Sequence, residues 1–218
     1  MNILTGILNL ALAASFAPAD RPVLDRCSTL VGSCEYYACV EEERISCGSR
    51  GYPMGYGANY CEKLSALEFF PARTSFNQQV FPADGNAWRD EVRTCLQEEM
   101  DSYFIQAAEE GEEVSCGSLK AFAFNSHPRC YTQNEELSFC ELTPESVIKV
   151  GLTIAPQDLF SNESLTQVRD TAAICSKQIG NRLQSEPNFL VRLQLHKYRA
   201  IWESVALNPL LLNQLGGL

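Results

Sequence analysis

The stretch DGNAWRDEVRTCLQEEMDSYFIQAAEE, residues 84–110, decides the fold of this chain. The triplet Asp84-Gly85-Asn86 is typical of a helix start. The large side chains that follow recur at steps of three and four residues, which is the period of an α-helix. They are Trp88, Val92, Cys95, Leu96, Met100, Tyr103 and Phe104. We therefore predict a long central helix over residues 84–110.

Helical patterns also precede the central helix. Residues 23–43 place cysteines and apolar groups on one face, at Cys27, Leu30, Cys34, Tyr37 and either Val40 or Glu41. Residues 48–57, GSRGYPMGYG, hold four glycines and a proline. Because glycine and proline both weaken an element interior, we expect an ordered loop there, with helix resuming at Ala58.

Further helices are expected after the central one. A short helix over residues 118–125 should end at Ser126-His127-Pro128, because proline lacks the amide that the next turn needs. Thr143-Pro144-Glu145 supplies a cap, a first-turn proline and an acid at the positive end of the helix dipole. Residues 161–164 open a helix that runs to about Leu183.

The last predicted helix, residues 189–207, carries a heptad-like stripe of five large apolar side chains. These are Val191, Leu195, Tyr198, Trp202 and Val205. Two alternatives stay open for the stripe: the helix folds back on its own domain, or it mediates non-covalent self-association into a homodimer, with Pro209 and the leucines at 210–212 extending the contact. Alternating β-branched runs are scarce, so the predicted class is all-α: a disulfide-rich helical domain with a C-terminal amphipathic helix.

Ten cysteines, an even number spread along the chain, are typical of a disulfide framework and of an oxidising compartment. Residues 3–16 form an apolar run followed by small residues, which is typical of a cleaved signal peptide. The predicted organisation is a signal peptide over residues 1–19, a disulfide-stapled helical domain over 20–183, and a C-terminal helix and tail over 184–218. We expect a secreted, extracellular protein.

Composition and motifs exclude several functions. A net charge of −10 disfavours nucleic acid, which needs clustered Lys and Arg, and no other stretch reaches the roughly 20 apolar residues of a membrane span. The cysteines contain no Cys-x-x-Cys pair, so we expect no zinc site. The two histidines, His127 in a predicted turn and His196 on the last helix, are expected to be turn or surface residues. Lacking a catalytic motif, the chain is expected to be no enzyme and to bind no cofactor or metal.

The spacing of the cysteines resembles that of the stanniocalcin family. Cys34-Glu-Tyr-Tyr-Ala-Cys39 is similar to the family's Cys-Gly-Ala-Phe-Ala-Cys segment. The interval from Cys116 to Cys130, followed at once by Tyr131, and the interval from Cys140 to Cys175 also look like their stanniocalcin counterparts. Gly85, Trp88 and residues 91–95 add a shorter likeness. The resemblance covers residues 27–175.

That resemblance implies a disulfide pairing, which sequence alone leaves open among roughly a thousand possibilities. The implied pairs are Cys27 with Cys39, Cys34 with Cys61, Cys47 with Cys116, Cys95 with Cys130, and Cys140 with Cys175. The chain also departs from the family. No cysteine follows Cys175 to link two subunits, and the family's glycosylation sequon is replaced by Arg44-Ile45-Ser46. Asn162-Glu163-Ser164 is instead a possible glycosylation site.

The resemblance implies a secreted hormone-like regulator that binds a receptor or another extracellular protein and acts in calcium or phosphate homeostasis. A secreted protease inhibitor or another extracellular binding module is the alternative, because a rigid disulfide scaffold is pre-organised for binding. An enzyme would need a pocket with convergent titratable groups.

Overall fold

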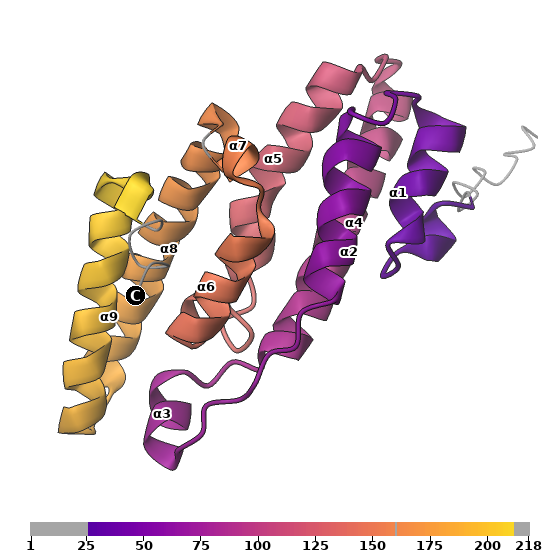
Figure 1. Ribbon diagram of the computed structural model, residues 1–218. Coiled ribbons are helices and arrows are strands. Elements are labelled where there is room, and N and C mark those ends of the chain that lie inside the picture. Colours follow the sequence, from indigo (N-terminus) through magenta and orange to yellow (C-terminus); the bar gives the residue numbers. More distant parts are fainter. Residues whose placement is uncertain (1–25, 160, 212–218) are drawn as a thin grey trace, which may run out of the picture.

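The computed structural model describes residues 26–159 and 161–211, and in these ranges the chain is all-α, without a β-strand (Figure 1). The predicted fold class is therefore confirmed. The predicted signal peptide, residues 1–19, lies outside the described ranges. The α-helices are α1 (Glu35–Cys39), α2 (Asn59–Ser65), α3 (Ser75–Val80), α4 (Gly85–Glu110), α5 (Cys116–Thr132), α6 (Pro144–Thr153), α7 (Pro156–Leu159), α8 (Asn162–Ser185) and α9 (Phe189–Leu207).

Two helical hairpins carry the architecture. Helices α4 and α5 pack against each other, α5 packs against α8, and α8 packs along α9. In Figure 1 these helices follow one another across the molecule, with α9 at one edge and α1 near the other. Short 3₁₀ segments lie at Ser28–Leu30, Phe139–Glu141 and Pro209–Leu211, and π-helical turns at Val40–Arg44 and Tyr52–Ala58.

Side-chain caps explain why the predicted helix starts are correct. The Asp84 carboxylate accepts hydrogen bonds from the backbone amides of Asn86 (2.8 Å) and Ala87 (3.0 Å) and so begins α4. Thr143 and Ser161 cap α6 and α8 in the same way. Each cap satisfies amides that the first helical turn leaves without a partner. Helices α4, α6, α8 and α9 begin where the sequence predicts.

The prediction of one helix over residues 23–43 is wrong. Gly32 has a φ of +92°, a left-handed conformation that ends the helical path between Ser28–Leu30 and α1. The buried Gln97 of α4 holds this turn, since its oxygen accepts from the Gly32 amide (2.6 Å) and its amide donates to the Ser33 carbonyl (2.8 Å). A long-range contact therefore sets the break.

The predicted loop over residues 48–57 is also partly wrong, because Tyr52–Ala58 forms a π-helical turn that leads into α2. The glycine at position 57 serves close packing rather than a loop. A Cβ atom there would lie 2.3 Å from Cδ1 of Tyr37. Only glycine lets this turn lie directly against the Tyr37 ring.

Helix α5 corrects a third prediction, because it continues through Pro128 to Thr132. Proline cannot donate to the carbonyl of Phe124, four residues earlier. The side chain of Gln167, on α8, replaces that donor: its Nε2 lies 2.9 Å from the Phe124 oxygen. Helix α8 thus supplies the donor that the Phe124 carbonyl would otherwise lack, and α5 can continue past the proline.

Five disulfides join these elements, and they are the five pairs that the resemblance implies. The pairs are Cys27–Cys39, Cys34–Cys61, Cys47–Cys116, Cys95–Cys130 and Cys140–Cys175, with Cα–Cα distances from 4.9 to 5.7 Å. One of them joins α4 to α5, and another ties the 3₁₀ segment before α6 to α8. A covalent bond therefore closes the α4–α5 hairpin, and another ties α8 of the second hairpin to the segment before α6.

The stripe of α9 packs on its own domain. Val191, Leu195, Tyr198, Trp202 and Val205 are all buried, in the same core as Trp88 of α4 and Ile179 of α8. Of the two alternatives, the structure shows the first, in which the helix folds back on its own domain; it contradicts self-association through these five residues, since side chains buried in one chain are not available to a second copy. It also makes the C-terminal helix an integral part of the main core.

Candidate functional site

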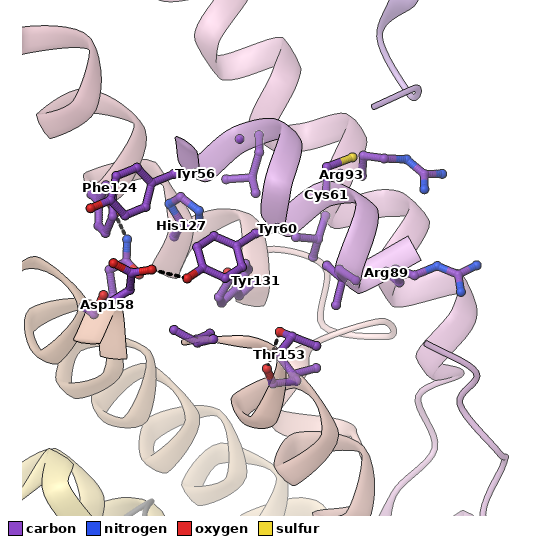
Figure 2. Close-up of a pocket in the computed structure, with 18 of the residues that line it drawn as sticks. Tyr56, Tyr60, Cys61, Arg89, Arg93, Phe124, His127, Tyr131, Thr153 and Asp158 are labelled. Carbon is purple, nitrogen blue, oxygen red and sulfur yellow. Dashed lines mark hydrogen bonds between the residues drawn. The ribbon is translucent and has the colours of Figure 1, made fainter. Parts of the chain in front are cut away.

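A cavity of about 100 Å³ lies where two hydrophobic cores meet. One core contains α8, α9 and the N-terminal half of α4; the other contains α1, the Tyr52–Ala58 turn and the N-terminal half of α5. Aromatic side chains dominate the walls, among them Tyr37, Tyr52, Tyr56, Phe124, His127 and Tyr131. Figure 2 shows rings from α5 and from the turn before α2 gathered on one side of the space.

Helical spacing brings these rings together. Phe124, His127 and Tyr131 lie at i, i+3 and i+7 on α5, so they share one face. Their rings are in contact, with centroids 5.7 Å apart for Phe124 and His127 and 5.5 Å apart for His127 and Tyr131. Tyr56 meets the same face edge-on, 5.4 Å from Phe124. The result is a wall of edge-to-face aromatic contacts.

His127 is neutral in this wall. Its Nδ1 lies 2.6 Å from the Ala123 carbonyl oxygen, which accepts a hydrogen bond and so places the ring proton on Nδ1. Burial lowers the pKa of His127 to about 4, against smaller opposing effects of the Ala123 and Phe124 carbonyl groups. Nε2 is then a hydrogen-bond acceptor, and the described part of the chain offers it no donor. The expectation that His127 is a turn or surface residue is wrong.

Tyrosine hydroxyls share the cavity with His127. Burial raises the pKa of Tyr52 and of Tyr131, and the nearby phenol of Tyr37 raises both further. These phenols therefore remain protonated at any physiological pH. Neither the Tyr52 nor the Tyr131 hydroxyl has a hydrogen-bond partner among the described residues.

A phenol–carboxylate pair closes one side of the cavity. The Tyr60 hydroxyl, on α2, donates to Asp158 of α7 and accepts from the Ala155 amide at 3.2 Å (Figure 2). Burial raises the pKa of Tyr60 to about 12, and the hydrogen bond to Asp158 adds to the shift. The turn between α6 and α7 is thus tied across the cavity to α2.

Acid should destabilise the fold through His127. The pKa of His127 is about 4 in the folded chain and about 6.5 in the unfolded chain. The unfolded chain therefore takes up a proton first, so the contribution of the neutral ring to folding stability is complete above pH 6.5 and is lost as the pH falls toward 4. At 1.36 kcal/mol per pH unit this amounts to about 2 kcal/mol at pH 5. Urea unfolding measures the free energy of unfolding at pH 7 and at pH 5. Between these two pH values, His127→Gln should lose about 2 kcal/mol less of that free energy than wild type does. His196→Gln, on exposed helix surface, is the matched control, and an equal loss in wild type and His127→Gln would contradict the prediction.

A second candidate surface is the outer face of α9, opposite its buried stripe. It carries five large apolar side chains that are at least 40% exposed: Phe189, Leu190, Leu193, Ile201 and Leu207. Arg192 and Lys197 are exposed beside them, and within the described ranges neither has an ion-pair partner. Helix α9 lies at the edge of the molecule in Figure 1. Phe189, Leu190 and Leu193 lie together at the N-terminal end of α9, whereas Ile201 and Leu207 lie in its C-terminal half. Exposed apolar groups beside charged ones are typical of a protein-binding surface.

The residues predicted from sequence are not brought together in one site. Asn162 is the exposed first residue of α8, so a glycan there would project into solvent. The cavity was not predicted from the sequence. One signal was present: Tyr52, Tyr56 and Tyr60 recur at steps of four residues, which indicates an aromatic helical face that begins within the segment assigned to a loop and continues into the next helix.

Metal-type ligand atoms come together at Cys27, Cys39 and Glu43. The two sulfurs form a disulfide and so provide no thiolate for a metal ion.

None of the helices in the described ranges is both long enough and apolar enough to cross a membrane. No protein family, curated protein or solved structure matches this chain.

Proposed function

We propose that this chain is a secreted regulatory protein of the stanniocalcin kind, which acts by binding an extracellular protein and influences calcium or phosphate transport. The observation that carries the binding function is the outer face of α9. Its five exposed apolar side chains would lose unfavourable contact with water in a complex, and each fully buried one contributes about 1.5 to 3 kcal/mol. The five disulfide pairs, which are those that the stanniocalcin resemblance implies, support this part of the proposal. Secretion and a glycan on Asn162 belong to the same proposal.

Charge indicates what kind of partner fits this face. The chain as a whole carries −10, whereas the exposed rim of α9 presents Arg192 and Lys197. An acidic partner surface complements these cations. A second copy of the chain fits less well, because a symmetric contact sets the same patch against itself and brings the cations of the two copies together.

The test is a transport assay with matched variants. Purified secreted protein is applied to cells of the source organism, and calcium and phosphate uptake are followed against dose. Leu193→Glu with Arg192→Glu should lose at least about tenfold in potency, since buried anchors dominate binding. Leu152→Glu, at a leucine on α6 that is 71% exposed against 45% for Leu193, should keep full potency. Uptake that stays unchanged at saturating dose would contradict the transport role, and equal potency of the two variants would contradict the role of α9.

A further inference from the structure

The cavity between the two cores contains polar atoms that the fold itself leaves without partners. The Tyr52 side chain is 4% exposed, whereas the side chains of His127 and Tyr131 are partly exposed; neither tyrosine hydroxyl has a hydrogen bond within the described part of the chain. Nε2 of His127 is an acceptor without a donor there. These three atoms can be reached from the cavity, so water or a ligand that enters the cavity supplies their hydrogen-bond partners.

Size and wall chemistry limit that ligand to a single small ring system. The cavity volume is about 100 Å³, smaller than the roughly 150 Å³ enclosed cavity that holds benzene in a well-studied case, but this cavity is partly open, so a small ring can extend toward its mouth. Its walls are aromatic rings in edge-to-face contact, as between Tyr56 and Phe124 or His127 and Tyr131. Such walls favour another aromatic ring, which continues the same packing.

The charged groups near the cavity exclude an ionic ligand. Figure 2 shows the side chains of Arg89 and Arg93 pointing away from the aromatic cluster. Arg89 donates to the Leu67 carbonyl at 2.7 Å, and both arginines donate to the Asp90 carboxylate at 3.0 Å, although Nε of Arg93 is buried without a partner among the described residues. Asp158 is engaged by Tyr60. A buried ligand charge would therefore lose its hydration without gaining an ion-pair partner.

We propose that this cavity binds a small neutral aromatic compound with a hydroxyl or ring N–H group, of the phenol or indole class. The ligand's polar hydrogen is donated to Nε2 of His127, the tyrosine hydroxyls of Tyr52 and Tyr131 hydrogen-bond to its polar atom or ring face, and the ring fills the aromatic space. This site is distinct from the outer face of α9 and independent of the transport role, so either can fail without the other.

The experiment titrates the full-length secreted protein with p-cresol and indole at pH 7, and follows binding by calorimetry and by ¹H–¹⁵N NMR. Both probes should saturate and shift amides of α5 and of the Tyr52–Ala58 turn. Toluene has the same ring without a donor and should bind about two- to tenfold more weakly, the usual effect of one neutral hydrogen bond. Benzoate, which is ionised, should not bind.

Single-atom variants identify the hydrogen-bonding groups. Tyr131→Phe and Tyr52→Phe should each weaken p-cresol binding by about two- to tenfold, and His127→Phe by at least tenfold because it also fills part of the space. Tyr103→Phe is the matched control: Tyr103 stacks on Phe122, 4.3 Å away, and does not line the cavity. Absence of saturable binding, equal affinity for toluene and p-cresol, or a Tyr103→Phe effect as large as that of Tyr131→Phe would overturn the site.

Discussion

Replacing Trp202 with alanine should lower the free energy of unfolding by about 3 to 5 kcal/mol. The Trp202 side chain is 3% exposed, and its ring packs against Phe139 and Tyr198 with centroids 5.8 and 5.7 Å away. Truncation removes this apolar contact and leaves a cavity in a core that is already closely packed. Urea unfolding followed by circular dichroism measures the loss.

Two further variants separate packing from polarity and from helix propensity. Among the described residues the buried indole Nε1 of Trp202 makes no hydrogen bond of normal geometry, although it lies close enough to the Tyr198 hydroxyl to lower the pKa of that phenol, so Trp202→Phe removes a poorly satisfied polar group along with some volume. Trp202→Phe should therefore lower the free energy of unfolding much less than Trp202→Ala does. Leu207→Ala, at a leucine that is 88% exposed on the same helix, should stay within about 0.5 kcal/mol of wild type. A folded Trp202→Ala protein with near wild-type stability and an altered oligomeric state would contradict the packing of α9 on its own domain.

Removing the Cys47–Cys116 disulfide with a double change to serine should lower the free energy of unfolding by about 4 kcal/mol. This bond spans 69 residues, the longest sequence separation of the five. Loop-closure entropy makes the stabilisation grow with the size of the closed loop, and a loop of this length gives about 4 kcal/mol. Neither cysteine belongs to a buried core, so the loss comes from the unfolded chain rather than from a cavity.

The Cys27–Cys39 disulfide provides the comparison. It spans only 12 residues, which by the same reasoning gives about 3 kcal/mol, but both cysteines are buried in the second core. Removing this disulfide should therefore lower the free energy of unfolding in two ways: by a smaller loop-closure entropy and by the loss of core packing. Equilibrium unfolding without reductant compares the two double variants with Ser46→Ala, an exposed position next to Cys47. A change below 1 kcal/mol for the Cys47–Cys116 variant would contradict the loop-closure account.

The two candidate binding sites lie in different parts of the molecule. The outer face of α9 lies on the side of the main core, whereas the cavity lies at the junction of both cores. Disulfides hold α4 to α5 and the segment before α6 to α8, so the helices around the cavity are joined covalently. Rigid walls reduce the entropy that binding would otherwise cost.

Local signals determined much of this fold. Caps at Asp84, Thr143 and Ser161, together with apolar steps of three and four residues, predicted α4, α6, α8 and α9 because their interactions lie within one or two helical turns. The five disulfide pairs came from a family resemblance, since cysteine count and spacing leave many pairings open. None of the cavity was predicted.

Tertiary contacts decided the rest. Pro128 remains inside α5 only because Gln167, 43 positions from Phe124, binds the carbonyl that proline leaves free. Gln97 holds the turn at Gly32 from 65 positions away, and the stripe of α9 is buried by α8 rather than by a second copy. A sequence period shows which side chains share a face, but not what covers that face. That outcome depends on which distant helix supplies the missing partner or apolar surface, which only the folded chain specifies.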